Sequence, residues 1–318
     1  MATRRRRYAP LVHAFRFAVQ LARASSGEGW AQAARRAESL GYDVLAMPDH
    51  LGNQLSPLAA LSAAAAATTR LRVCAFVFAN DYRHPLILAR EAATLDLLSG
   101  GRFEMGLGAG WMVEDYCRLG MSYDPGPRRV DRLEEAVPLM KRLLAGETVT
   151  HDGPHYHLVR AGVGVETVQK PRPPLAVGAG GPRMLRLAAR EADIVGLLPG
   201  FSGEGRARLL QATEAATAEK VALVREAAGD RFERLELNIW LADAGMVGGG
   251  NSLLGSATAA ARWIPAAVVR SPYVLYGTLG ALRERLLRRR DRLGISYYTI
   301  PGRAMEEMAP LVEALAGR

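Results

Sequence analysis

The stretch Tyr42-Asp-Val-Leu-Ala-Met-Pro-Asp-His50 is an apolar run that is typical of a buried strand and that ends in a polar Asp-His pair. Before it, residues 27–41 show helical spacing of their apolar side chains and stop at a glycine. After it, residues 57–69 are rich in alanine and also predict a helix. Helix, strand and helix thus alternate around this stretch, which is the pattern of a parallel α/β fold.

The same alternation continues along the chain. Short apolar runs that predict strands lie near residues 15, 42, 71, 102, 174, 193, 235 and 295, and helical sequence follows each of them. Eight strand–helix units in 318 residues favour a closed (β/α)8 TIM barrel over an open doubly wound sheet. We therefore expect an α/β protein with a single barrel domain over residues 1–318.

Three segments depart from the alternation. Residues 1–13 are expected to form a basic tail rather than an export signal, because charged residues interrupt the apolar stretch that follows the arginine run. Residues 148–172 are expected to leave the barrel as a hairpin around the turn at Asp152-Gly153-Pro154. Residues 246–272 are rich in glycine and then in alanine, and they predict an insertion that caps the barrel mouth before the last strand.

The composition excludes several classes of protein. Lys and Arg number 41 against 32 Asp and Glu, a formal net charge of +9, but no basic stripe is interleaved with aromatic residues, so we expect no nucleic-acid partner. No apolar run reaches the roughly 18–20 residues of a membrane span, so we expect no membrane partner. The two cysteines, Cys74 and Cys117, give no disulfide framework, which suits a cytoplasmic protein. An anionic small ligand is compatible with the positive charge.

In a barrel of this kind, the active site lies at the carboxyl ends of the strands. The second expected strand ends at Asp49 and His50. His50 is the strongest candidate for a catalytic residue, because an imidazole gives or takes a proton near neutral pH. The alternative is a histidine that only satisfies a loop or caps the next segment. Asp49 likewise has two interpretations, since it could orient the imidazole or cap the residues that follow.

Glycine clusters stand at two further strand ends. Gly106-Leu-Gly-Ala-Gly110 and Gly178-Ala-Gly-Gly181 each follow an apolar strand and precede helical sequence. Backbone amides at such turns approach an anion closely, and a helix N-terminus adds a favourable dipole. Tight strand–helix turns use glycine in any case, but two clusters together predict an anion cradle. His151, His155 and His157 do not converge on one helix face, so we expect no metal site.

These strand ends belong to longer motifs. Gly41-Tyr-Asp-Val-Leu precedes Pro48-Asp49-His50, and Leu98-Ser-Gly-Gly-Arg-Phe103 leads into Gly106-Leu-Gly-Ala-Gly-Trp111. With these motifs, the chain resembles the bacterial luciferase-like flavin-dependent monooxygenase superfamily over about residues 14–302. The Asp-His pair and the segment Asn80-Asp-Tyr-Arg-His-Pro85 make it most similar to the branch that uses the deazaflavin coenzyme F420.

The resemblance implies a (β/α)8 barrel, a small-molecule substrate and a homodimer that pairs through helices near strands two and three. In the deazaflavin branch, the histidine that matches His50 lies beside the reactive carbon of the ring. A bulge of strand three with a non-proline cis peptide backs the ring and maps onto Phe76-Val77, and glycine turns follow the ring and the phosphate tail. The cofactor-binding residues that the resemblance implies are Asp49, Phe76, Val77, Asn80, Gly108, Gly110, Gly178, Gly180 and Gly181.

One position departs from part of this branch. Its sugar-phosphate dehydrogenases have a glutamate acid where Trp111 stands, and the chain lacks an evident lysine set for a sugar phosphate. Glucose 6-phosphate is therefore not the expected substrate. Trp111 is expected to pack against the substrate or the ring, and the apolar stretch Leu253–Val269 suggests a partly hydrophobic substrate.

The sequence thus predicts an oxidoreductase that transfers a hydride between coenzyme F420 and a small organic substrate, by reduction of a C=C or C=N bond or the reverse. His50 would give or take the accompanying proton. An FMN-dependent monooxygenase of the same fold, fed by a separate flavin reductase, is the alternative, because the phosphate cradle serves either cofactor. A third interpretation is a cofactor-binding protein without catalysis, against which His50 and the expected lid argue.

Overall fold

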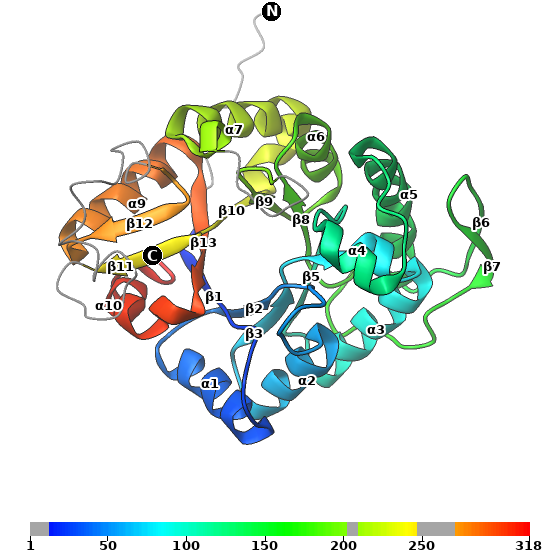
Figure 1. The fold of residues 1–318 in the computed structure, drawn as a ribbon, viewed down its shortest axis with the longest axis horizontal. Helices are drawn as coiled ribbons and strands as arrows, with labels where there is room; N and C mark the ends of the chain where they lie inside the picture. Colours follow the sequence, from blue (N-terminus) through cyan, green and yellow to red (C-terminus); the bar gives the residue numbers. More distant parts are fainter. Residues whose placement is uncertain (1–12, 202–208, 247–270) are drawn as a thin grey trace, which may run out of the picture.

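Parallel strands close into a barrel that helices surround (Figure 1). The computed structural model describes residues 13–201, 209–246 and 271–318. Neighbouring strands follow the order β3-β2-β1-β13-β10-β9-β8-β5, and β3 also pairs with β5, so the sheet closes on itself. The expected TIM barrel and its eight strands are confirmed. The strands are β1 (Arg16–Gln20), β2 (Val44–Met47), β3 (Arg72–Ala75) with its continuation β4 (Phe78–Ala79), β5 (Phe103–Gly108), β8 (Leu175–Ala179), β9 (Ile194–Leu197), β10 (Glu236–Trp240) and β13 (Ile295–Pro301).

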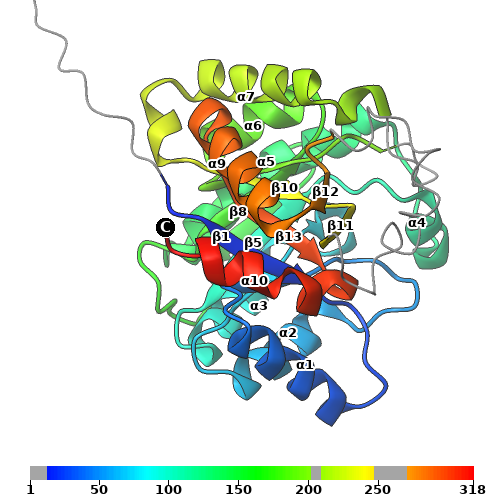
Figure 2. The same cartoon turned by 90° about the vertical axis from the view of Figure 1, so that its left-hand side faces the viewer.

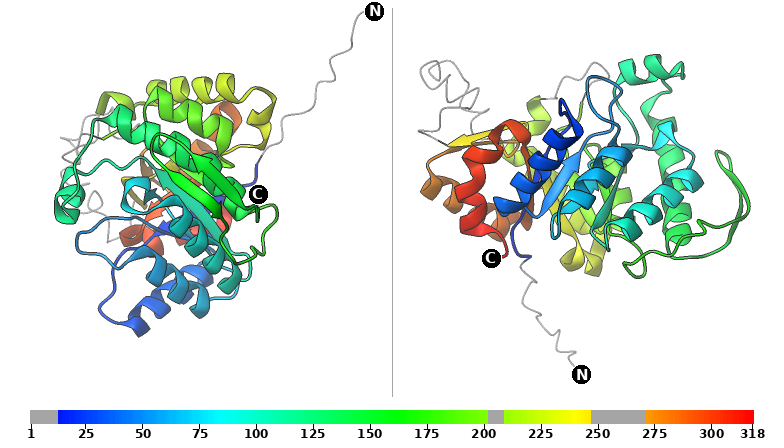
Figure 3. Two further views of the ribbon diagram at one scale, coloured as in Figure 1. Left: turned by 90° about the vertical axis from the view of Figure 1, so that its right-hand side faces the viewer. Right: turned by 90° about the horizontal axis from the view of Figure 1, so that it is seen from below.

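Helices form the outer layer, as the turned views show (Figures 2 and 3). In α1 (Gly27–Ser39), the Ser26 side chain caps the first turn by accepting a hydrogen bond from the Gly29 amide at 3.0 Å, and the buried Trp30 donates from Nε1 to the Ala60 carbonyl at 2.7 Å. The helices around the barrel are α1 (Gly27–Ser39), α2 (Pro57–Ala67), α3 (Pro85–Leu98), α5 (Gly126–Leu144), α6 (Pro182–Glu191), α7 (Glu214–Ala228), α9 (Leu279–Leu293) and α10 (Met305–Leu315). None of the helices in the described ranges has the length and apolar character that crossing a lipid bilayer requires.

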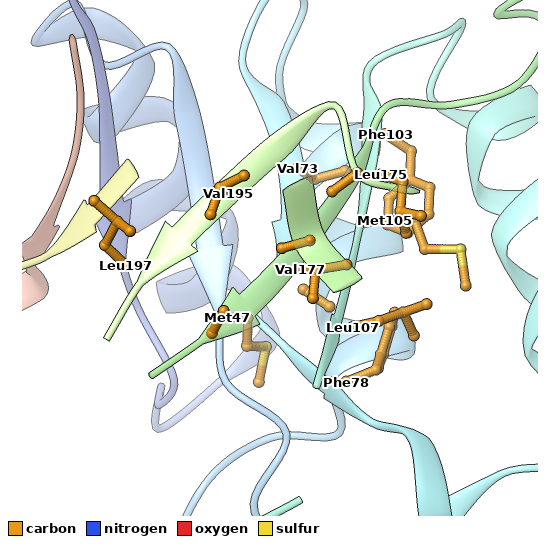
Figure 4. Close-up of a cluster of buried hydrophobic side chains, with 14 of the residues drawn as sticks. Met47, Val73, Phe78, Phe103, Met105, Leu107, Leu175, Val177, Val195 and Leu197 are labelled. Atoms are coloured by element: carbon orange, nitrogen blue, oxygen red, sulfur yellow. The ribbon is translucent and has the colours of Figure 1, made fainter. Parts of the chain in front are cut away.

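The strands are buried on both faces, because helices cover their outer face and side chains fill the inside. Along β2, Leu45 and Met47 belong to the larger buried cluster, part of which Figure 4 shows. Val44 and Ala46 belong to a second, smaller cluster. This alternation follows from the period of two in a strand. The barrel interior is thus a packed core, and a ligand has to bind at one of its ends.

Two helices begin at other residues than their sequence pattern predicts. The pattern of residues 204–228 predicts one long helix, but α7 begins at Glu214, because the Thr213 hydroxyl accepts a hydrogen bond from the Ala216 amide and caps it there. Residues 204–208 lie outside the described residues. The pattern of residues 130–144 predicts another helix, which is α5; it begins at Gly126, because a proline in its first turn suits the helix start.

The structure describes some of the segments that interrupt the alternation of strands and helices. The expected hairpin is confirmed, since β6 (Val149–Asp152) pairs antiparallel with β7 (His157–Ala161). A short helix that the sequence did not predict, α4 (Val113–Leu119), follows β5.

Most of the insertion expected at 246–272 and of the basic tail expected at 1–13 lies outside the described residues. On either side of the insertion, β11 (Asp243–Met246) and β12 (Val274–Gly277) pair in parallel. The sequence analysis did not predict these two strands.

A cluster of charged side chains lies at the amino ends of the barrel strands. Arg16 forms ion pairs with both Glu104 and Glu236, and Arg72 donates to the same Glu104 carboxylate at 2.6 Å. Glu104 is 1% exposed, and its pKa is lowered because the two guanidinium groups outweigh the effect of burial. Charged pairs at this end of a barrel serve stability rather than catalysis.

Glu236 makes this cluster sensitive to pH. Burial raises the pKa of its carboxyl to about 7, against 4.5 in a free side chain, although Arg16 acts in the opposite direction. Between these values the folded protein keeps a proton that the unfolded chain releases, so the free energy of unfolding falls as the pH rises and levels off above pH 7. We expect Glu236→Gln to remove this contribution. Thermal unfolding of both proteins across that pH range tests it, and parallel curves would contradict it.

Candidate active site

A cavity of about 570 Å³ lies at the carboxyl ends of the barrel strands. Its volume is in the usual range for small-molecule sites. Every residue that the sequence analysis assigned to the site lines this cavity except Asn80. Those residues are Asp49, His50, Phe76, Val77, Gly108, Gly110, Trp111, Gly178, Gly180 and Gly181.

The His50 imidazole is held in place by a buried carboxylate. Asp115, on α4, is 1% exposed and accepts a hydrogen bond from Nδ1 of His50 at 2.7 Å. Its other oxygen accepts one from the Leu51 amide at 3.0 Å. Nε2 of His50 has no hydrogen-bond partner among the described residues. An imidazole whose Nδ1 is fixed in this way offers Nε2 for proton transfer.

Asp49 does not orient the imidazole. Its carboxylate accepts hydrogen bonds from Arg83 at 2.6 and 3.1 Å and from the Ala79 amide at 3.1 Å. Asp49 therefore joins the end of β2 to the end of the third barrel strand. The role of orienting His50, which the sequence analysis considered for Asp49, belongs to Asp115.

Strand three forms the floor of the cavity. The Phe76–Val77 peptide bond is cis, as the resemblance implies, and both side chains line the cavity. A Cβ atom on Gly108 would lie 2.7 Å from a methyl group of Val77, and one on Gly178 would lie 3.3 Å from the other. A side chain larger than glycine at position 108 would overlap Val77, which gives Gly108 a structural role alongside any contact with a ligand, whereas the contact at Gly178 is only tight.

Aromatic side chains form one wall. The Trp111 ring stacks on Phe201, with 4.9 Å between ring centroids, and meets His50 edge to face at 5.3 Å. Trp240 meets Phe201 at 6.1 Å, and its Nε1 donates to the Gln20 side chain at 2.5 Å. The wall next to the imidazole is thus apolar, and it suits an apolar or planar ligand.

Asn80 lies outside the cavity. It belongs to a short 3-10 turn, η1 (Asn80–Tyr82), and its side-chain amide donates to the Tyr156 hydroxyl at 2.9 Å. At 1% exposed, Asn80 has the surroundings of a residue that fastens the loop to the neighbouring hairpin.

The sequence analysis missed several residues that line the cavity. Gln20 and Trp240 are the last residues of β1 and β10, so the rule that sites lie at carboxyl ends of strands could have found them. Arg129, in the first turn of α5, also lines the cavity and resembles a solvated helix residue in the sequence. Asp115 carries no local signal, because only the packing of α4 brings it to His50.

A closed (β/α)8 barrel with an imidazole, an aromatic wall and glycine turns around a cavity at its carboxyl end has the architecture of a TIM-barrel enzyme. Residues 11–228 match the family model of luciferase-like monooxygenases, and the chain belongs to this family.

Curated relatives share part of the sequence. The F420-dependent glucose-6-phosphate dehydrogenase of Microbacterium testaceum is 34% identical over 165 residues, which are 49% of this chain and 48% of that protein. The enzyme of the same name from Beutenbergia cavernae is 34% identical over 214 residues, 64% of this chain and 61% of that one. The chain thus matches about half to three fifths of the length of these relatives.

Solved structures match over nearly the whole chain. The coenzyme F420 dependent tetrahydromethanopterin reductase of Methanopyrus kandleri superposes with a TM-score of 0.76 at 18% identity, covering 95% of this chain and 99% of that one. An F420-dependent secondary alcohol dehydrogenase gives a TM-score of 0.74 at 17% identity, with the same coverage. At these identities the likeness concerns the fold.

Proposed function

We propose that this protein is an oxidoreductase that transfers a hydride between coenzyme F420 and a small organic substrate. The observation that carries the proposal is the His50 imidazole, fixed by buried Asp115, on the wall of a cavity that glycine turns also line. The printed names of the curated relatives support the choice of F420. The reaction proposed is reduction of a C=C or C=N bond or its reverse.

The residues present fit a planar ring with an anionic tail. Phe76 and Val77 line the cavity beside Gly108 and Gly178 and give it an apolar floor, which suits a ring system. A Cβ on Gly181 would meet no atom within 4 Å, so the turn before α6 leaves open space beside its free backbone amides. Such a helix start favours a phosphate group.

Each group of the chain has a separate part in this reaction. The bound deazaflavin would supply two-electron hydride chemistry and react poorly with oxygen. Nε2 of His50 would give or take the proton that accompanies the hydride, and Asp115 would hold the imidazole at Nδ1. Trp111 and Phe201 would position the substrate and exclude water.

The charged side chains around the cavity indicate which class of substrate it suits. Around the cavity, the described ionisable side chains with a formal charge are Asp49, which is paired with Arg83, and Arg129, apart from the titratable His50. Trp111 stands where sugar-phosphate dehydrogenases would need an acid. We therefore propose a partly hydrophobic substrate in place of glucose 6-phosphate.

A cofactor titration tests the proposed function. Titrating the purified protein with oxidised F420, and separately with FMN, is expected to give saturable binding of F420 and much weaker binding of FMN. The family also contains monooxygenases, so oxygen uptake with reduced FMN is the second measurement. Tight FMN binding together with oxygen uptake would replace the proposal by an FMN-dependent monooxygenase, and binding of neither cofactor would refute both.

We also propose that the protein forms a homodimer. Helix α3, which follows strand three, exposes Ile87, Leu97 and Leu98, the last at 68%. Exposed apolar side chains at both ends of one helix support a contact between copies. Light scattering of the purified protein measures its mass, and a monomer mass at micromolar concentration would overturn the proposal.

A further inference from the structure

The side-chain amide of Gln20 has a fixed orientation on the cavity wall. Gln20 is the last residue of β1 and lines the cavity, as does Trp240 at the end of β10. Nε1 of Trp240 donates a hydrogen bond to Oε1 of Gln20 at 2.5 Å. Because an indole N–H can only donate, the amide oxygen has to face Trp240. The Nε2 amino group of Gln20, with its two N–H donors, therefore faces away from the indole nitrogen.

These two N–H donors are available to a ligand. Among the described residues, Trp240 is the one hydrogen-bond partner of the Gln20 side chain. Gln20 is half-buried, so its amide is partly shielded from bulk water and still borders the cavity. A donor that a bound ligand covers without pairing costs free energy, whereas an acceptor oxygen on the ligand satisfies it. The cavity therefore favours a ligand that places an oxygen against Nε2 of Gln20.

The amide shares the cavity with the imidazole and the aromatic wall. β1 pairs in parallel with β2, which leads on to His50, so the amide and the imidazole stand at neighbouring strand ends. Trp240, which holds the amide, meets Phe201, and Phe201 stacks on Trp111. Stacked aromatic rings favour a flat ligand. A flat ligand on this wall thus has one group that transfers a proton and one that donates a hydrogen bond beside it.

We propose that the substrate is a flat α,β-unsaturated carbonyl compound whose carbonyl oxygen accepts a hydrogen bond from Nε2 of Gln20. The inference rests on the proposed function and names its substrate class. In the reduction, the β carbon accepts a hydride from reduced F420, which becomes oxidised, and the electron pair of the C=C bond shifts so that the carbonyl oxygen takes the negative charge. Nε2 of His50 then gives its proton to the α carbon. The C=C bond becomes single and the C=O bond is restored.

The Gln20 donor distinguishes this class of substrate from the alternatives. An isolated C=C bond has no oxygen to take the developing charge. An imine receives the proton on its own nitrogen and brings no oxygen to the amide. The oxygen of a simple ketone receives the proton itself, so it has to face His50 and not Gln20. A fixed donor at the atom where charge develops is worth about 10²- to 10³-fold in rate.

Binding of a stable enolate mimic tests the donor without turnover. The probes are 4-nitrophenolate, whose ring oxygen carries the charge, and 4-nitrotoluene, which has a methyl group in its place. Calorimetric titration of the wild type is expected to show about 10-fold or more tighter binding of the phenolate. Gln20→Met should abolish this preference, and Gln20→Glu, which still accepts from Trp240 but repels the phenolate, should invert it. Gln32→Met is the matched control, because Gln32 is exposed on α1 outside the cavity.

Trp240 acts as a positioning residue through Gln20. Trp240→Phe keeps an aromatic ring in the wall but removes the N–H donor that turns the amide. The preference for phenolate over 4-nitrotoluene is therefore expected to fall between those of the wild type and Gln20→Met, while the affinity for 4-nitrotoluene stays unchanged. An unchanged preference in Trp240→Phe would contradict this role, because a merely structural role affects both probes alike.

Turnover with reduced F420 tests the substrate class. Cyclohex-2-enone is expected to be reduced at its C=C bond about 10²-fold faster than cyclohexene, cyclohexanone or a cyclic imine of the same size, and Gln20→Met should remove most of that advantage. Product analysis by gas chromatography shows which bond is reduced. Fluorescence titration of F420 is run on every variant, and its affinity is expected to stay at the wild-type value.

The outcomes separate this inference from the proposed function. Wild-type protein that binds F420 but reduces the imine or the ketone fastest, or that binds both nitro compounds equally, overturns the substrate class and leaves the proposed function intact. Wild-type protein that does not bind F420 refutes the proposed function. Loss of F420 affinity in Gln20→Met would assign the amide to the cofactor ring and overturn the inference. If Gln20→Met does not fold, the phenolate preference of Gln20→Glu decides.

Discussion

Replacing His50 by asparagine is expected to lower kcat for hydride transfer by about 10²- to 10⁴-fold and to leave the affinity for F420 nearly unchanged. Asparagine keeps a polar side chain of similar size but cannot give or take a proton near neutral pH. Steady-state rates, measured with F420 absorbance and a substrate found by screening, give kcat. A fluorescence titration gives the affinity independently of turnover.

The control for His50 is a histidine elsewhere in the chain. His157 is exposed on the β6–β7 hairpin and pairs with Asp152 at 2.6 Å, outside the cavity. His157→Asn should therefore have the turnover of the wild type. Wild-type turnover in His50→Asn would remove the imidazole from the mechanism, and a large loss of F420 binding would move its role from proton transfer to holding the ring.

Substituting alanine for Gly106 is expected to destabilise the barrel strongly, by about 3 kcal/mol. A Cβ atom there would lie 2.0 Å from the carbonyl oxygen of Ala75 on the third barrel strand, so one of the two strands has to move. The backbone cannot give way as a flexible side chain can, and the strain falls where β3 and β5 close the ring. Thermal or urea unfolding measures the loss.

Gly280 provides the matched control for Gly106. It lies in α9, and a Cβ atom added there would meet nothing within 4 Å. Gly280→Ala is expected to keep or slightly raise stability, since alanine favours helix more than glycine does. Equal unfolding midpoints for the two alanine variants would show that the barrel tolerates the shift of β3 or β5.

The features that the sequence predicted correctly are those that depend on residues close to one another along the chain. Apolar runs between helical segments located the eight strands, and the end of one run located His50 at the cavity. Asp115 depends on how α4 packs, which leaves no periodic signal in the sequence. Asn80 was assigned to the cofactor site, but a 3-10 turn directs its side chain to Tyr156. Arg129 went unnoticed because an arginine near a helix start is usually solvated.

The segment from Trp111 to Asp115 both lines the cavity and holds the His50 imidazole. The Trp111 ring meets His50 edge to face and stacks on Phe201, while Asp115 on α4 accepts the hydrogen bond from Nδ1 of His50. Reshaping this segment to admit a bulkier compound would also shift the His50 imidazole. Laboratory evolution toward bulkier substrates is therefore expected to require additional substitutions on β2 that restore the position of the imidazole.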